Sequence, residues 1–382
     1  MGKMSRDDGF TITEMMVATT VVLLVLGGAL TTFKNALAIN DSASQLADAN
    51  QNLRAGTNQL IRDLLMAGRM IGTEGIAMPT GPGITFARPG PVAGMTFDMV
   101  PDTDSTLQMP SITTGYQLGP TIKGSRTDLV TILTVDEFMP IVSTPPNVAG
   151  APTGGEATLA PDGTYVTFAA VSQWIDGDTI NDTAKVKVGD LVLYVGTNGN
   201  AIQTVTSIDT TLHRIYFAPG DFFRFNQPNA TTPPPAACPC ASGRPLGVLK
   251  GKPLATDDWS NVKVTLFKAL MITYYVDATT TPNTPRLTRV LNNFTPQALA
   301  GVVEDLDLTY DLYDGVVNPT ALAFLPQTIN AVVYSENQIR KVNLHVGVRS
   351  ETISKPSQDY VRNHITTSVN VRSLAAVDKY PS

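Results

Sequence analysis

The chain has 382 residues, of which 16% are charged and 43% hydrophobic, and it contains 30 glycines and 27 prolines. This length accommodates one membrane helix together with one large or two small globular units. The low charge and high turn content are typical of secreted β-rich domains rather than of cytosolic enzymes. The formal net charge of −6, without a basic stripe, argues against nucleic acid as the main partner.

A short polar segment, residues 1–9, precedes an apolar run at the amino terminus. The segment ends at Gly9, and the residues from Phe10 to Glu14 lead into residues 15–30, which carry no charge. A secretory signal peptide places its cleavage site after the apolar run, whereas the plausible site here lies before it. Glu14 stands at the mouth of a membrane-spanning segment. A carboxylate is costly there unless it is paired, so its position indicates a function.

This arrangement resembles the class III leader of type IV pilins and of the pseudopilins of type II secretion. The resemblance implies that a prepilin peptidase cuts between Gly9 and Phe10 and then methylates the amino group of Phe10. Glu14 would be the fifth residue of the mature chain. The leader departs from the pattern in carrying as many acidic as basic residues, which weakens the orientation signal. The alternative is an ordinary signal anchor in which the glutamate is incidental.

Residues 10–33 are predicted to form a transmembrane and assembly helix. They reach about 36 Å at ~1.5 Å per residue, which is enough to cross a bilayer. Residues 34–72 are predicted to continue the helix with one apolar stripe on an otherwise polar surface, typical of a helix packed on a partner. The alternative is a separate surface helix after a break at Gly27-Gly28, because paired glycines weaken a helix. The stripe consists of Ile39, Leu46, Leu53, Leu60, Leu64 and Ile71.

The first half of a continuous helix ending near Ile71 would have nothing of its own domain to pack on. After leaving the membrane, it must bury itself against the same segment of other subunits, as in a helix bundle at the centre of a fibre. We expect the Glu14 carboxylate to pair there with the amino terminus, Phe10, of a neighbouring subunit. This pairing would set the register, because a displaced subunit leaves an unpaired charge in a low-dielectric core.

Residues 73–260 are predicted to form a β-rich globular region with proline- and glycine-containing loops. We expect residues 72–124 to be irregular with a few short strands, and residues 145–161 to be a flexible loop. The expected strands cover residues 127–135, 165–171, 185–194, 202–208 and 213–217.

Residues 261–382 are predicted to form an antiparallel sheet with one buried face, because apolar and polar residues alternate along them. The natural cover for the apolar face is the helical stripe from Leu46 to Ile71. The predicted fold class is therefore α+β, a long amino-terminal helix packed on an antiparallel sheet with an additional β-rich insertion. The alternating segments are residues 262–266, 305–312, 341–349 and 365–371.

The polar face of that sheet carries charged residues that we interpret as structural. Asp305, Asp307 and Asp311 are expected to pair across strands with Lys341 or Arg349. Such pairs make a modest contribution to stability and do not indicate catalysis.

The chain is also similar to the PilW-type minor pilins. The strongest motifs are VVEDLDLTY at residues 302–310 and VGVRS at residues 346–350 together with VRSL at residues 371–374, whereas residues 79–125 and 144–163 have no counterpart. Further motifs lie at residues 52–54, 63–69, 127–130, 188–192, 272–276 and 286–289.

This similarity implies a low-abundance subunit that waits in the inner membrane as a single-pass protein, with its carboxyl-terminal domain in the periplasm. It would later lie in the pilus at the cell surface and help to prime or support pilus assembly, and thereby adhesion and twitching motility. The implied partners are other minor and major pilins through the amino-terminal helix, the prepilin peptidase, the inner-membrane assembly platform and, as a further option, a tip adhesin. The alternatives are a type II secretion pseudopilin and a membrane-anchored adhesin or binding module.

The sequence contains no constellation typical of an enzyme, a cofactor site or a metal site. Residues 247–252 resemble a phosphate loop but have the wrong spacing and context. The acidic clusters at residues 102–104 and 176–182 do not fit the calcium-loop pattern. We therefore expect no catalytic residues, no cofactor and no metal. The three histidines, which lack metal-ligand spacing, are His213, His345 and His364.

Cys238 and Cys240 are the two cysteines of the chain and flank a single proline. A disulfide across one intervening residue is strained. We interpret the pair as a loop tip with labile or unpaired thiols.

Overall fold

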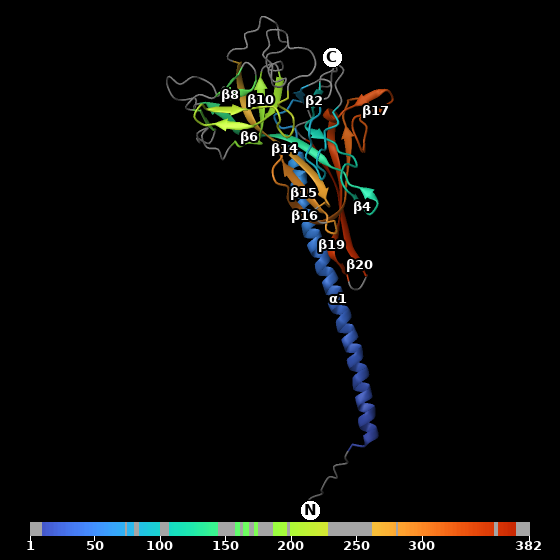
Figure 1. Cartoon of the computed structure of the whole chain (residues 1–382). Coiled ribbons are helices and arrows are strands. Elements are labelled where there is room, and N and C mark those ends of the chain that lie inside the picture. Colours follow the sequence, from blue (N-terminus) through green and yellow to red (C-terminus); the bar gives the residue numbers. More distant parts are fainter. Residues whose placement is uncertain are drawn as a thin grey trace, which may run out of the picture.

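A single long helix, α1, projects from a β-rich head (Figure 1). Gly9, Cys238, Cys240, residues 247–252 and both acidic clusters lie outside the described residues. The computed structural model describes residues 10–72, 75–79, 84–99, 107–143, 157–160, 163–167, 172–174, 186–196, 199–227, 262–279, 282–354 and 358–371.

Helix α1 covers Ile12–Leu65 and runs through Gly27 and Gly28 without a break. At ~1.5 Å per residue, its 54 residues reach about 80 Å. The apolar and head-facing halves therefore form one continuous helix, as the continuous-helix prediction requires (Figure 1).

The helix ends at Leu65, six residues before the end near Ile71 that the apolar stripe suggests. Strand β6 (Val130–Ser143) forms hydrogen bonds with the turn that follows the helix. The Met66 carbonyl accepts a hydrogen bond from the Thr134 hydroxyl at 2.7 Å, and the Gly68 N–H donates to the Leu133 carbonyl at 2.9 Å. Gly68 has a φ of 73°, the left-handed conformation in which glycine commonly ends a helix. Ile71 therefore lies in the turn beyond the helix.

The head is built around an antiparallel sheet, which confirms the predicted fold class. The alternation expected for its carboxyl-terminal strands is present, since Leu306, Leu308 and Tyr310 are buried and the residues between them are not. Strand β15 was not expected, because its burial does not alternate regularly. The central strands, in spatial order, are β14 (Val262–Asp277), β15 (Arg286–Leu291), β16 (Gln297–Leu312), β19 (Ile339–Ser354) and β20 (Asp359–Asn370).

The insertion forms shorter strands that attach to the same sheet through β14, which pairs with β6, β7 and β10. Strand β7 lies inside residues 145–161, which we expected to be a loop, because Ala157 and Leu159 are buried in a core cluster of the insertion. In chain order, the strands of this region after β6 are β7 (Ala157–Leu159), β8 (Tyr165–Thr167), β9 (Ser172–Trp174), β10 (Leu191–Gly196), β11 (Gly199–Thr204), β12 (Ser207–Asp209) and β13 (Arg214–Tyr216).

Small elements complete the head, including the few short strands expected within residues 72–124. They are β1 (Ile76–Met78), β2 (Leu107–Met109), β3 (Ile112–Thr113), β4 (Thr121–Ile122), β5 (Ser125–Arg126), β17 (Gln327–Ile329), β18 (Val332–Tyr334) and the 3-10 helix η1 (Glu336–Gln338).

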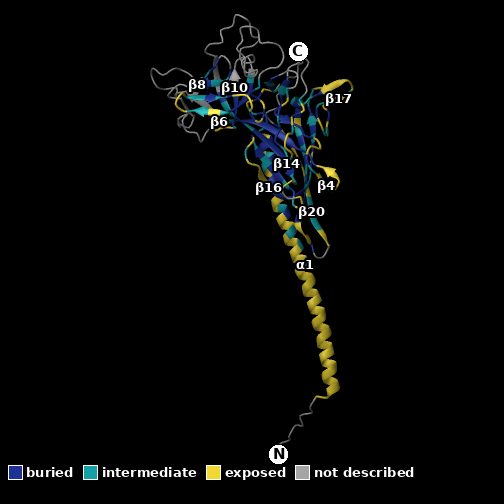
Figure 2. Ribbon diagram, in the orientation of Figure 1, coloured by how far each residue is buried: buried dark blue, intermediate teal, exposed yellow. Residues whose placement is uncertain are grey.

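The upper end of α1 covers the apolar face of the sheet, as predicted (Figure 2). Leu53, Leu60 and Leu64 are at most 3% exposed and belong to the main core cluster. Burying each of them contributes roughly 1.5–3 kcal/mol. Gly56 lies on the same face, where an ideal Cβ would come within 2.8 Å of the Cβ of Ala300. The helix backbone thus rests directly on β16, and glycine is required for this close approach.

A buried ionic group also ties the helix to the sheet. The Asp63 carboxylate is 1% exposed and accepts hydrogen bonds from the Tyr274 hydroxyl at 2.5 Å and from Nε of Arg289 at 2.7 Å. The Gln59 side chain donates to the other carboxylate oxygen at 3.2 Å. Burial, together with the neighbouring Asp63 charge, raises the pKa of Tyr274. Asp63 is therefore held by partners from both the helix and the sheet.

Asp63→Ala should lower the free energy of unfolding by about 3–5 kcal/mol, because it leaves Arg289 largely buried without its partner. Glu351→Ala is the matched control, since the Glu351–Arg286 pair at 3.1 Å is exposed and such pairs contribute about 1 kcal/mol or less. Denaturant unfolding of both variants measures the difference. Equal losses would contradict the anchoring role of Asp63.

Candidate assembly site

The lower half of α1 exposes a continuous apolar surface (Figure 2). Large hydrophobic side chains along residues 10–37 are exposed by between 52%, at Leu26, and 91%, at Phe10. By length and composition, α1 is the one helix in the described part of the chain that could cross a membrane. An exposed apolar surface of this length needs lipid or another protein as its cover.

Glu14 lies in the first turn of this surface and forms a capping box with Thr11. Its Oε2 accepts hydrogen bonds from the Thr11 backbone N–H at 3.0 Å and from the Thr11 hydroxyl at 2.9 Å. The Glu14 N–H in turn donates to the Thr11 hydroxyl at 3.3 Å. The carboxylate thus sits at the amino-terminal end of the helix, where the helix dipole favours negative charge.

This geometry leaves the Glu14 carboxylate able to accept an additional partner. Within residues 10–371, no lysine or arginine whose position is described pairs with it. Thr11 is not among the residues predicted above for assembly, although a threonine three residues before a glutamate is the spacing of a capping box. Thr11 therefore positions the carboxylate that the leader motif singles out.

The predicted packing stripe lies in two different environments. Leu53, Leu60 and Leu64 lie beneath the sheet, and Ile71 is 7% exposed in a separate cluster beside β1 and β2. Ile39 and Leu46 are 66% and 38% exposed, and they flank Ser42, whose hydroxyl bonds to the Ser354 hydroxyl of β19 at 2.7 Å. The lower part of the stripe thus continues the exposed apolar surface toward the head.

The charged outer face of the sheet is only partly as predicted. The Asp311–Lys341 pair forms at 3.0 Å. Arg349 instead pairs with Glu304 at 2.9 Å. The reason is a register shift between Val303 and Asp305, which places Glu304 at an irregularity of β16.

The histidines do not assemble a metal site in the described ranges. His345 and His364 lie with their rings 5.4 Å apart, and Nε2 of His345 is 3.6 Å from Asp305. His213 lies in the turn before β13 with a φ of 52°. Among the residues whose positions are known, no group of three or more His, Cys, Asp or Glu side chains could hold a metal ion.

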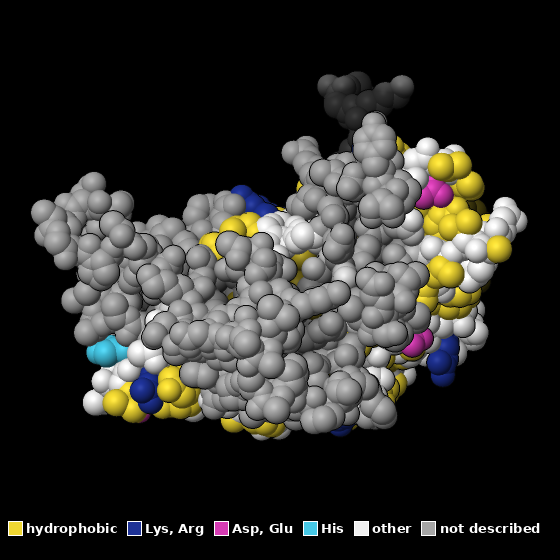
Figure 3. Space-filling view, turned by 90° about the horizontal axis from the view of Figure 1, so that it is seen from above, with side chains coloured by type: hydrophobic (Ala, Val, Ile, Leu, Met, Phe, Trp, Pro, Cys, Tyr) yellow, Lys and Arg dark blue, Asp and Glu magenta, His cyan; other side chains and the backbone are white. Residues whose placement is uncertain are grey.

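A second apolar surface lies at the distal end of the head. Val316, Val317, Val332 and Val333 are 48–85% exposed around β17 and β18, and Phe324 in the same segment is 45% exposed. Seen from above, apolar side chains gather on the side where these elements lie (Figure 3). This surface faces away from the amino-terminal end of α1 (Figure 1).

Residues 4–30 match the family described as the prokaryotic N-terminal methylation motif. No curated protein and no solved structure matches the chain. The matched segment contains Phe10, Glu14 and most of the exposed apolar surface, and it implies processing by a prepilin peptidase and assembly with pilins. The hydrophobic helix with this motif suggests anchoring in the inner membrane before assembly. The chain thus combines a prepilin-type N-terminal methylation motif with a pilin-like α+β fold, in which a long helix packs on an antiparallel sheet.

Proposed function

We propose that the protein is a minor pilin of the type IV pilus, of the PilW type, and that it enters the fibre non-covalently to prime or support assembly. The observation that carries the proposal is the exposed apolar half of α1, which carries Glu14 in its first turn and has no cover from the described part of the head. The large head favours a low-abundance subunit, because a subunit repeated at high density is normally smaller. Adhesion and twitching motility would then depend on it through the pilus.

The proposed path begins in the inner membrane, with residues 10–33 crossing the bilayer and the head in the periplasm. The prepilin peptidase removes residues 1–9 by cutting after Gly9 and methylates Phe10. The assembly platform then transfers the helix from lipid to the bundle of pilin helices. There Glu14 pairs with the amino terminus of a neighbouring subunit, and the apolar surface of α1 packs on the helices around it. No step of this path needs a catalytic residue or a cofactor in this chain.

Contacts of the head would select among neighbours. The distal apolar surface around β17 and β18 supports a contact with a further minor pilin or a tip adhesin, because it lies at the end opposite the membrane helix.

A pseudopilin of a type II secretion system is the second candidate, because the same amino-terminal motif and helix serve both assemblies. Deletion of the gene separates the two. Loss of surface pili and twitching supports the pilus role, whereas loss of protein secretion with intact pili supports the secretion role. A membrane-anchored binding module that never polymerises would be missing from sheared fibres.

The mature chain should begin at N-methylated Phe10. Intact-mass analysis of the protein extracted from membranes of cells with active prepilin peptidase measures this directly. Gly9→Val is the matched variant, and it should retain residues 1–9 because the small residue before the cut is lost. A wild-type chain that still begins at Met1 in such cells would count against the proposal.

Glu14→Gln should reduce the amount of the protein in sheared fibres at least tenfold, because the amino group of a neighbour is then buried without its charged partner. Asp41→Asn is the matched control, since it neutralises an exposed carboxylate on the same helix outside the apolar half. Immunoblots of sheared fibres and of membranes compare the two variants. Equal fibre content of wild type and Glu14→Gln, with equal membrane content, would refute the role of Glu14.

A further inference from the structure

Strand β20 is the last strand in the order of the main sheet, and no strand among the described residues pairs with its other edge. It has 12 residues and pairs with β19 on one side only, while α1 packs against its inner face. Proteins usually protect long edge strands with charges, prolines, bulges or a covering element, because the edge offers unpaired backbone groups to other chains. The protection along β20 is therefore informative.

The register of β20 identifies which backbone groups point outward. The Val371 N–H donates to the Arg340 carbonyl at 2.9 Å, in the same register that pairs Asn370 with Lys341. In an antiparallel ladder, the residues bonded to the partner strand alternate with residues whose N–H and C=O point away from it. Thr366, Ser368 and Asn370 therefore direct their N–H and C=O groups to the open edge. In the described part of the chain, no hydrogen bond reaches these groups.

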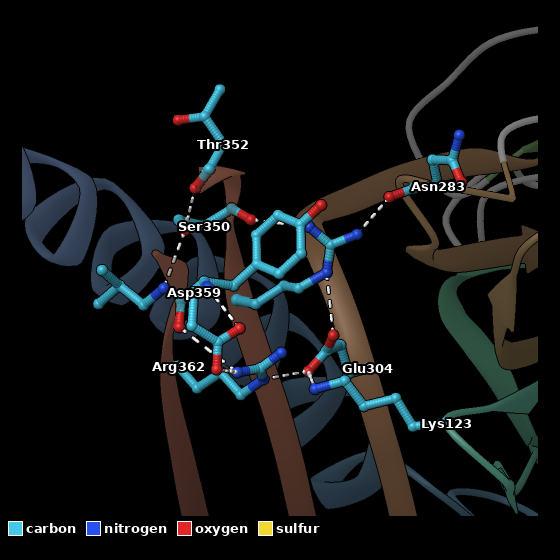
Figure 4. A network of polar contacts seen from close by, with 10 residues as sticks. Lys123, Asn283, Glu304, Ser350, Thr352, Asp359 and Arg362 are labelled. Carbon is cyan, nitrogen blue, oxygen red and sulfur yellow. Dashed lines mark hydrogen bonds and ion pairs between the residues drawn. The ribbon is translucent and has the colours of Figure 1, made fainter. Parts of the chain in front are cut away.

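The lower half of β20 is occupied by side-chain contacts. Arg362 pairs with Asp359 and with Glu304, each at 2.9 Å (Figure 4). The side chain of Asn363 accepts a hydrogen bond from the His364 N–H at 2.9 Å, and it also bonds to Asn50 of α1. The outward N–H of His364 thus already has a hydrogen-bond partner. The lower half of β20 also carries charged side chains, which disfavour the addition of another strand.

The upper half of β20, residues 365–370, lacks this protection. Its sequence, Ile-Thr-Thr-Ser-Val-Asn, contains no charge and no proline. Ile365 and Val369 face the core beside α1, whereas Thr366, Ser368 and Asn370 are exposed on the outer face. Three residues with free backbone groups at a spacing of two match the hydrogen-bonding period of an additional strand.

The β20 edge of a second copy does not fit this edge. Antiparallel pairing of two β20 edges relates the copies by a two-fold axis normal to the sheet, which reverses the direction of one α1 helix. Parallel pairing places the two α1 helices on opposite faces of the joined sheet. Both arrangements keep the apolar halves of the helices from packing side by side in one membrane or one fibre. A strand of a different protein is not restricted in this way.

We propose that the upper half of β20 accepts an extended strand from a different subunit of the assembly. Cross-strand neighbours share a face, so this strand should place apolar side chains beside Ile365 and Val369 and hydroxyl or amide side chains beside Thr366 and Ser368. The identity of the donor as a fibre subunit rests on the proposed function, whereas the open edge does not. Strand addition would give pairwise selectivity, which the general packing of apolar helices lacks.

Ser368→Pro tests the edge, because it removes an outward N–H without breaking a bond to β19, the position at which an edge strand tolerates proline. Ser368→Ala is the matched control, which removes the hydroxyl and keeps the N–H. Thr366→Pro repeats the test at the neighbouring outward donor. Thermal unfolding of the full-length chain in detergent identifies the proline variants that remain folded, and the measurement is made on these.

The probe is a fluorescein-labelled peptide of eight residues, with alternating valine and threonine between two terminal lysines. Fluorescence anisotropy should give the same Kd for wild type and Ser368→Ala, and a Kd roughly fivefold to tenfold higher for Ser368→Pro, as expected for one lost backbone hydrogen bond. A peptide with a central proline should bind none of the proteins.

Three outcomes would overturn the proposal. The first is an absence of peptide binding to wild type, and the second is equal binding to wild type and Ser368→Pro. The third is binding only after the chain is shortened to end at Val371, which would mean that the carboxyl-terminal residues of the full-length chain cover the edge. Failure of peptide binding in a protein that still enters fibres in a Glu14-dependent manner would reject the edge proposal alone. Peptide binding by a protein absent from fibres would reject the proposed function alone.

Discussion

The lower half of α1 is not covered by the described part of its own head, so its apolar surface needs lipid or another protein as a cover. The buried residues of the helix begin at Ala49 and continue to Leu64, whereas residues 12–37 expose their large apolar side chains. In the proposed function, lipid covers this surface before assembly and the same segments of neighbouring subunits cover it afterwards. A polar partner for Glu14 is needed in both environments, and the capping box with Thr11 supplies part of it within the subunit.

Buried contacts between the helix and the head fix their relative orientation, which matters for assembly. Gly56 lets the helix backbone lie against Ala300, and Asp63 bonds to Tyr274 and Arg289 across the same interface. The helix also runs unbroken through Gly27 and Gly28. The orientation of the head relative to the apolar half is thus fixed by buried contacts. A neighbour that packs on the helix meets the head at a defined place, and the edge of β20 beside α1 becomes a surface at which neighbours are distinguished.

The sequence allowed prediction of the features that depend on local patterns. The leader follows from the residues around Gly9 and Glu14, and the candidate membrane span follows from an uncharged apolar run. The helix cover and the alternating strands β16 and β19 follow from hydrophobic periodicity. Sequence-based prediction failed where residues far apart in the chain determine the end of an element or the partner of a charged group. The helix ends at Leu65 because Leu133 and Thr134 of β6 accept or donate bonds to the turn after it, and β7 forms because β14 supplies a neighbour. Likewise, Arg349 pairs with Glu304 because of a register shift that no single segment encodes.

The central claim is that the apolar half of α1 exchanges lipid for the helices of other subunits. Disulfide or bis-maleimide cross-linking of a Leu23→Cys variant, in a chain whose Cys238 and Cys240 are replaced by serine, tests it most directly. Leu23 is 67% exposed in the middle of the apolar half. The account predicts cross-links to pilin helices carrying a matching cysteine in sheared fibres, and uncross-linked protein in membranes of cells that do not assemble fibres. Protein that stays in the membrane and forms no such cross-links in assembling cells would contradict it.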